Sequence, residues 1–267
     1  MAIRSLLVPV DFLLEGDRAL PIAARLARVA HLPIELITVS SPWIDESSDV
    51  DELASRVHAL RPLQATWSIV HDDDPAAAIV RAIAARPDAL PVIGTGAPGP
   101  LTELVLGDVG EAVLAHSERP ILFVGPNAEL QVDRVERVMV AVSSWDGGEA
   151  LLDAVADLVS VVPAAVEVVE VVDPEGAAIA DAPDAESNLV RGMANALRRR
   201  NVPAQWDVLH DEEPLAGIVA AAADRKATIL VAATTRWVTR QRVHPRSTVR
   251  RMVRDVEAAV LVVPRPE

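Results

Sequence analysis

Apolar and polar residues alternate along the chain in blocks that predict strands and helices in turn. Short apolar runs such as 5–10, which ends at Asp11, are typical of buried parallel strands. Longer segments with helical apolar spacing, such as 16–30, predict helices. The first half is predicted to hold strands at 5–10, 33–39, 66–71, 90–93 and 121–124, and helices at 16–30, 50–60, 76–86 and 101–117.

The same order of blocks recurs in the second half, which indicates an internal repeat. From Trp67 to Val124 the chain matches residues 139 positions later without a gap, as in Trp67 with Trp206 and Pro75 with Pro214. Nearer the start of each copy the offset is about 132. Predicted strands of the second copy lie near 137–142, 165–172, 204–209, 228–233 and 259–263. The repeat predicts domains at 1–126 and 137–267, joined by a linker at 127–136.

Strands that alternate with helices of this length predict βαβ units and a parallel sheet. The predicted fold class is therefore α/β, with two Rossmann-like, five-stranded parallel sheets in tandem and helices on both faces. Ligands of such sheets bind beyond the carboxyl ends of the strands, where the strand order reverses. The candidate positions follow Val10, Val39, Ile93, Val142, Val172 and Ala232.

Composition narrows the class of protein. Apolar residues make up 51% of the chain, enough for sizeable cores, and no apolar run approaches the ~18 residues of a membrane span. We expect no membrane segment and no secretory signal, and a cytoplasmic location. Cysteine is absent, which excludes disulfides and thiolate chemistry. The net charge of −14 disfavours binding to nucleic acid or to an anionic membrane.

The charge is uneven, because residues 236–254 hold seven arginines and no acid. Such a cluster, with hydroxyl residues beside it, is a candidate anion site in the second domain. The alternative is a solvated loop and helix whose arginines pair with acids of the same chain. Trp237 is the only aromatic residue in the cluster, so base stacking is disfavoured. The candidate anion-binding residues are Thr234, Arg236, Arg246 and Ser247.

Each copy also has a histidine followed by three acids and a proline, at 71–75 and 210–214. Clustered carboxylates with histidine suggest a metal site. Acids just before a helix whose first residue is proline are, however, typical of helix caps, and we favour that interpretation. The sequence predicts no bound metal.

A glycine-rich segment, Gly-Thr-Gly-Ala-Pro-Gly at 94–99, matches the dinucleotide pattern G-x-G-x-x-G. It follows the fourth strand rather than the first, and no acid ends the next strand, which disfavours a nicotinamide site. The backbone N–H groups of such a turn can still hold phosphate, although the segment can equally be only a turn.

The context of this segment resembles the nucleotide-binding type of universal stress protein. Val92 and Ile93 precede it, Gly107 and Asp108 follow Ala97 after nine residues, and the segments 6–11 and 119–124 resemble the family's first and last strands. The resemblance covers essentially the whole chain, twice. It implies an adenine nucleotide alpha hydrolase-like fold and an adenine-nucleotide pocket in the first domain. The implied pocket residues are Val10, Asp11, Val39, Gly94, Thr95, Gly96, Gly107 and Asp108.

In that pocket the resemblance implies that the Val39 carbonyl meets adenine, Asp11 lies on the ribose side, and the glycine backbone meets the phosphates of ATP or another adenine nucleotide with Mg. The sequence itself requires no cofactor. It also departs from the family pattern, because Ala97 replaces a glycine and Asp108 replaces a serine or threonine. In the second domain Ala233, Arg236 and Arg246 replace glycines. Ordinary ATP binding is therefore weakened in the first domain and more so in the second.

No nucleophile elbow, P-loop or zinc-protease motif is present, which disfavours an enzyme. We predict a tandem, non-enzymatic universal stress protein that acts in stress response or signalling. By resemblance, its domains pair through the strands at 121–124 and 260–263 as an internal pseudo-dimer, and the chain forms a homodimer and has an unknown protein partner. The alternatives are a protein-interaction scaffold without a ligand and a weak ATP hydrolase at the first domain.

Overall fold

The structure is a computed structural model of the whole chain, and it describes residues 2–11, 18–41, 43, 47–95, 107–128, 135–142, 148–174, 183–234 and 248–264. Strands and helices alternate, as predicted. The first half contains β1 (Ser5–Pro9), α1 (Ala19–Ala30), β2 (Ile34–Ser40), α2 (Ser47–Ala59), β3 (Ala65–His71), α3 (Pro75–Ala84), β4 (Ala89–Gly94), α4 (Gly107–His116) and β5 (Ile121–Val124). The second half contains β6 (Arg137–Val142), α5 (Gly148–Val161), β7 (Ala165–Val172), α7 (Pro183–Arg199), β8 (Ala204–His210), α8 (Pro214–Asp224), β9 (Ile229–Thr234), α9 (Thr248–Asp255) and β10 (Ala259–Pro264).

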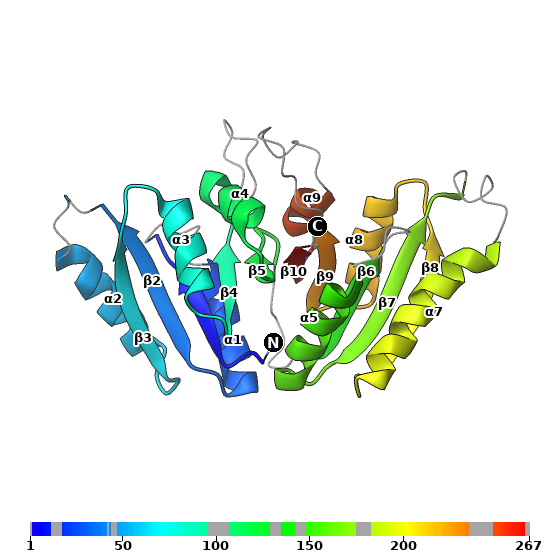
Figure 1. Cartoon of the computed structure of the whole chain (residues 1–267), viewed down its shortest axis with the longest axis horizontal. Coiled ribbons are helices and arrows are strands. Elements are labelled where there is room, and N and C mark those ends of the chain that lie inside the picture. The colour runs from blue at the N-terminus through cyan, green and yellow to red at the C-terminus, as the bar shows by residue number, and fades with distance from the viewer. Residues whose placement is uncertain are drawn as a thin grey trace.

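The strands form one sheet in the order β3-β2-β1-β4-β5-β10-β9-β6-β7-β8 (Figure 1). Within each half all strand pairs are parallel, which confirms the α/β fold class. The two predicted sheets are joined edge to edge by the antiparallel pair β5–β10, in which Leu122 lies opposite Leu261. The predicted pairing of the halves through their last strands is therefore confirmed. The exact domain boundaries stay a prediction.

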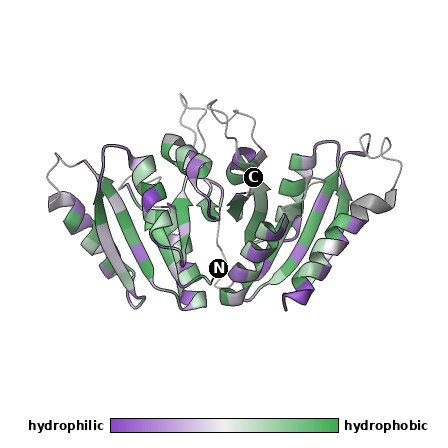
Figure 2. Cartoon of the chain, viewed as in Figure 1, coloured by the Kyte–Doolittle hydropathy of each residue, from purple (hydrophilic) through white to green (hydrophobic). Residues whose placement is uncertain are grey.

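Both faces of the sheet are covered by helices, so successive residues of a strand enter different core layers. Leu6 and Val8 of β1 pack in one cluster with Ile22 and Leu26 of α1, whereas Leu7 packs in the other with Ile83 of α3. Figure 2 shows the resulting concentration of apolar residues along the strands. None of the helices in the described parts of the chain has both the length and the apolarity that a membrane span needs.

Contacts between the first half and α9 also join the halves beside the β5–β10 pair. The Arg250 guanidinium lies 3.2 Å from the Glu111 carboxylate of α4, and both side chains are mostly buried. The amide of Asn127 donates to the carbonyl of Arg254 at 3.0 Å. The backbone at Gly125 approaches the carbonyl of Val253 so closely that a Cβ atom there would overlap the carbonyl oxygen. The glycine is therefore required by the contact between the halves.

We expect Gly125→Ala to lower the free energy of unfolding by about 1–3 kcal/mol, because the backbone of α9 cannot move as a flexible side chain could. Urea unfolding of the full chain measures the change. Gly192→Ala is the matched control, since a Cβ at that helical glycine meets nothing within 4 Å. The control should gain about 0.5–1 kcal/mol. Equal free energies of unfolding for Gly125→Ala and the unmodified chain would contradict the need for glycine at this contact.

Candidate functional site

The strand order reverses at β1, which has β2 on one side and β4 on the other. The chain runs from β1 through α1 to β2, and later returns through α3 to β4. Ligands of open α/β sheets bind in the crevice that this arrangement leaves beyond the carboxyl ends of the strands. The equivalent point of the second half lies at β6, between β7 and β9.

The end of β1 is held in place by β2. The N–H of Val10 donates to the Ile37 carbonyl at 2.8 Å, and the Thr38 hydroxyl donates to the Val10 carbonyl at 2.9 Å. Val10 is buried, while the next residue, Asp11, is exposed. The structure thus places Asp11 just beyond the end of β1, next to backbone that is fixed by β2.

The strand β2 extends past the end of β1, so part of its backbone faces the crevice. In the register of the pair, Pro9 lies opposite Ile37, and β2 continues to Ser40. The Ile37 carbonyl points towards β1, since it accepts from Val10, and the Ser40 carbonyl points the other way, since it accepts from Asp72. Peptide groups of a strand alternate in direction, so those of Val39 point to the same side as those of Ile37. Val39 therefore presents a donor and an acceptor beyond the end of β1.

The end of β4 is tied to β5. Thr95 is buried, and both its N–H and its hydroxyl donate to the Val124 carbonyl, at 2.9 and 3.2 Å. Both donors of this residue are engaged within the protein. The predicted contact of Thr95 with a nucleotide stays a prediction, and it would need the hydroxyl to turn away from Val124.

Five of the residues predicted to bind a nucleotide are brought to this one edge of the sheet, namely Val10, Asp11, Val39, Gly94 and Thr95. Gly107 and Asp108 begin α4, and Thr234 ends β9. The other predicted site residues lie outside the described residues, and these are Gly96, Arg236, Arg246 and Ser247. Two arginines of the basic cluster pair with acids of this chain, Arg250 with Glu111 and Arg254 with Asp255.

The crevice of the second half differs in a way that the motifs did not reveal. Glu170 of β7 lies beside Val142, the last residue of β6, and is only 4% exposed. It takes the place of Thr38, 132 positions earlier. The signal was present in the sequence as an acid inside the apolar strand 165–172, but it can be interpreted only once the two copies are aligned on their strands. A buried carboxylate at this point gives the crevice of the second half an ionisable group that the first half lacks.

Two of the groups with shifted pKa values, Glu35 and Arg86, lie at the opposite edge of the sheet. Hydrogen bonds from Arg86, at 2.6 Å between Nε and Oε2, hold the pKa of the Glu35 carboxyl below its ordinary value, and the same contact raises the pKa of Arg86. Glu35 is the second residue of β2 and is thus far along the strand from the crevice. Shifted pKa values can mark active sites, but here they mark an ion pair that fastens α3 to the sheet.

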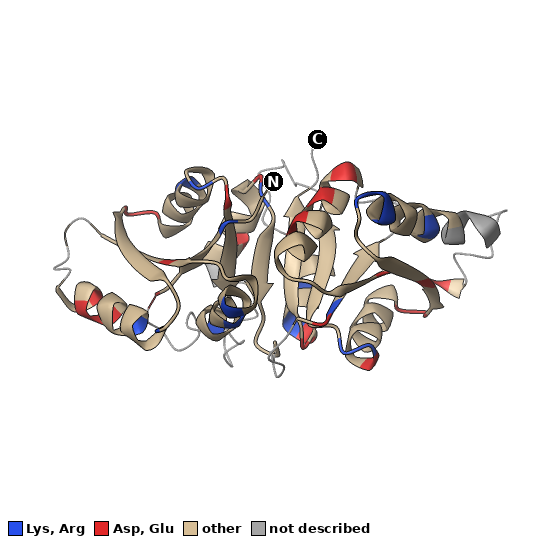
Figure 3. Ribbon diagram, turned by 90° about the horizontal axis from the view of Figure 1, so that it is seen from below, with Lys and Arg blue, Asp and Glu red and all other residues tan. Residues whose placement is uncertain are grey.

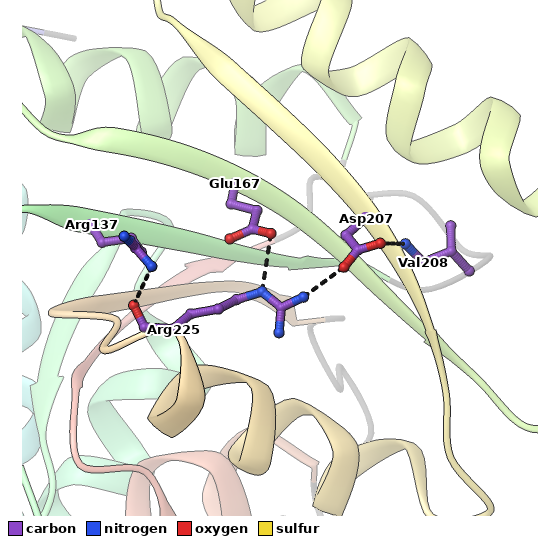
Figure 4. Close-up of polar contacts among 5 residues, drawn as sticks. All are labelled: Arg137, Glu167, Asp207, Val208 and Arg225. Carbon is purple, nitrogen blue, oxygen red and sulfur yellow. Dashed lines mark hydrogen bonds and ion pairs between the residues drawn. The ribbon is translucent and has the colours of Figure 1, made fainter.

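The second half repeats this ion pair, as Figure 4 shows. Arg225 donates from Nε to Glu167 at 3.0 Å and from Nη2 to Asp207 at 2.6 Å, while its carbonyl accepts from Arg137 at 2.6 Å. Asp207 stands where the first half has Ser68, which donates to Glu35 at 3.1 Å. The repeat has kept its structural ion pair while the crevice has changed.

Of the two acidic segments, the one before α3 caps its helix through a side-chain hydrogen bond, as predicted, whereas the one before α8 does not. Asp74 is the N-cap of α3, and its side chain accepts from the N–H of Ala77 at 3.0 Å. Its counterpart Glu213 is the N-cap of α8 but makes no such hydrogen bond. Within the described residues there is no group of three histidines or acids that could hold a metal ion.

Comparison with known proteins agrees with this geometry. Residues 2–125 match the model of the Universal stress protein family. The whole chain is similar to a universal stress protein from Archaeoglobus fulgidus, with 16% identity, coverage of 98% of both chains and a TM-score of 0.69. It is also similar to a functionally unknown protein from Pseudomonas aeruginosa, with 17% identity, coverage of 98% of this chain and 93% of that chain, and a TM-score of 0.69.

A more distant similarity joins the chain to the cytoplasmic domain of a prokaryotic cation chloride cotransporter. The identity is 14%, the coverage 97% of this chain and 95% of that domain, and the TM-score 0.52. At these identities the structural comparisons show the fold alone, because one fold can serve several functions. A search of the curated proteins finds no match to the chain.

The two caps make a matched pair of substitutions. We expect Asp74→Ala to destabilise the protein by about 1 kcal/mol, because the N–H of Ala77 loses its acceptor. Glu213→Ala should change stability much less, since that side chain caps nothing. Urea unfolding of both variants measures the difference. Equal losses would mean that the acids act through the helix dipole rather than through a cap hydrogen bond.

The ion pair of Glu35 predicts a pH dependence. A carboxyl whose pKa is lower in the folded chain stabilises the protein above its unfolded pKa, and this contribution is lost as the pH falls through the folded value. The Tm gap between the unmodified chain and Glu35→Gln should therefore be largest above about pH 4.3 and shrink at lower pH. Thermal unfolding across that range tests this, with the exposed Glu257→Gln as the control for loss of one charge. A gap that stays constant would contradict the prediction.

Proposed function

Residues 2–125 belong to the universal stress protein family, and from this premise we propose that the chain is a two-domain universal stress protein that binds an adenine nucleotide in its first half. We further propose that it acts in stress response or signalling as a binding protein rather than as an enzyme.

The observation that carries the proposal is the extension of β2 past the end of β1. It leaves the peptide groups of Val39 facing the crevice, where a neighbouring N–H and C=O can pair with the edge of an adenine ring. Asp11 stands at the same mouth and can accept hydrogen bonds from ribose hydroxyls. Gly94 ends β4 across the crevice, and the absence of a side chain there leaves room for a ligand close to the backbone.

A binding role is supported by where the ionisable groups lie. The carboxyl of Glu35, whose pKa is lowered, serves an ion pair at the far edge of the sheet. Thr95, the hydroxyl residue that follows β4, donates to the Val124 carbonyl. Nucleophilic catalysis needs a nucleophile within hydrogen-bonding reach of a base, and the hydroxyls of Thr38 and Thr95 each donate to a backbone carbonyl instead.

The second half is proposed to leave the nucleotide unbound. The buried carboxylate of Glu170 stands where the first half has the Thr38 hydroxyl, beside the position proposed for adenine, and it changes the size and charge of the crevice there. Binding should therefore saturate at one nucleotide per chain, which isothermal titration measures directly.

Thermal unfolding with and without about 1 mM Mg-ATP, AMP or cyclic AMP tests the proposal. A Kd near 10 μM adds about 2.7 kcal/mol of stability, a Tm rise of several degrees. Asp11→Asn should weaken binding about tenfold, because a hydrogen bond to a charged acceptor is replaced by one to a neutral amide. Asp88→Asn is the matched control, since Asp88 is also exposed but lies at the amino end of β4.

The other outcomes point to the alternatives. Absence of a Tm rise with every nucleotide would replace the proposal with a scaffold that acts through protein partners only. Release of inorganic phosphate from ATP, lost in Asp11→Asn but kept in Asp88→Asn, would make the first half a weak hydrolase. Two nucleotides bound per chain would contradict the role given to Glu170.

A further inference from the structure

A surface pocket lies between α1 and the segment that follows β5, and none of the described residues that line it is one of those named for the crevice. Its volume is about 250 Å³, below the usual range for pockets that hold drug-sized ligands. One wall is a stripe along α1 formed by Arg18, Pro21, Ile22 and Arg25, which recur at helical spacing. The facing wall comes from residues 125–128. Among the described residues that line the pocket, none is acidic.

Arg25 carries the main evidence for a ligand. Its Nη1 atom is buried and has no hydrogen-bond partner among the described residues. A buried guanidinium nitrogen without an acceptor is unfavourable, and proteins normally supply an acceptor or water. This arginine lines the pocket itself, so an anion bound there would provide the missing acceptor.

Arg18 provides a second cation at the other end of the stripe. Its Nη1 donates to the Pro126 carbonyl at 2.9 Å, which fixes the side chain across the pocket and leaves other guanidinium N–H groups for a ligand. The planar guanidinium fork matches the oxygens of a carboxylate or phosphate group. Pro21, Ile22 and Ala128 add apolar surface between the two cations.

The second half shows that the basic stripe is a specific feature of the first. With the copies aligned at an offset of 132, the buried positions of α1 coincide with those of α5, as Ala19 does with Leu151 and Leu26 with Leu158. At the same offset Arg25 corresponds to Asp157 and Pro21 to Asp153, and Asp153 pairs with Arg200 at 3.3 Å. Figure 3 shows the basic positions of α1 and the acidic positions of α5. The two helices share their buried face but carry opposite charge outside it.

We propose that this pocket binds a small molecule through one phosphate or carboxylate group, held between the guanidinium groups of Arg18 and Arg25. The described residues of this site differ from those named for the nucleotide crevice, and its volume is too small for a nucleotide. The segment that supplies the facing wall also contacts the second half, through the lining residue Gly125 at Val253 and through Asn127, which follows the lining residue Pro126, at Arg254. A bound anion would therefore brace the segment that joins the two halves.

The test is thermal unfolding of the full chain with sodium phosphate or sodium acetate against sodium chloride at equal ionic strength. At a concentration about five times its Kd, a bound anion should raise Tm by about 2–4 °C. The two probes distinguish phosphate from carboxylate as the preferred group. Arg25→Met should lose the rise, while its Tm without the anion should equal or exceed that of the unmodified chain, because the unpaired buried nitrogen is gone.

Arg28→Met is the matched control, since Arg28 is an exposed arginine of the same helix outside the pocket, and it should keep the full rise. Arg18→Met is a second pocket variant, and we expect it to lose most of the rise in Tm. It takes over the test if Arg25→Met does not fold. The proposal is overturned if neither probe raises Tm, or if the rise survives in the pocket variants. A rise that survives in Arg25→Met and Arg18→Met but disappears in Asp11→Asn would place the anion in the nucleotide crevice instead.

Discussion

The antiparallel pair β5–β10 holds the molecule together, because each of these strands would otherwise be an exposed edge. All four residues of β5 are buried, and every residue of β10 is buried as well. A strand that is apolar on both faces and unpaired along one side is a template for aggregation. In this chain the repeat supplies the missing neighbour, and the close contact of Gly125 with α9 and the buried pair Arg250–Glu111 complete the junction.

This junction explains why the two halves could diverge elsewhere. The contacts between the copies described above involve the last strands, α4, α9 and the segment after β5, whereas the central strands β1 and β6 lie farther along the sheet. The framework ion pairs, Glu35–Arg86 and Glu167–Arg225, are kept in both copies. At the crevice, by contrast, a threonine hydroxyl in one copy is a buried glutamate in the other. The crevices of the two copies thus differ in the polar group beside the end of the central strand.

Much of the fold could be predicted because the sequence carries its pattern twice. The order of strands and helices and the α/β class follow from apolar runs, helical spacing and the repeat at fixed offset, whereas the pairing of the last strands was predicted from the family resemblance. The candidate crevice was also predictable to the level of strand ends, since parallel strands place their carboxyl ends together. Sequence could not show that Thr95 points its donors at Val124, because a hydroxyl in a turn can face either the protein or a ligand.

The sequence by itself determined which segments are strands and helices, that they come in two copies, and which residues follow the strands of the crevice. These depend on local periodicity, which a single chain displays along its length. Only the tertiary structure showed that Glu170 is buried beside β6 and that Gly125 must lack a side chain because the backbone of α9 lies against it. It alone also showed that Arg18 and Arg25 share a pocket with Gly125, Pro126 and Ala128. Each of these depends on contact between segments far apart in the chain, and the physical reason is that burial and charge pairing are set by neighbours in space.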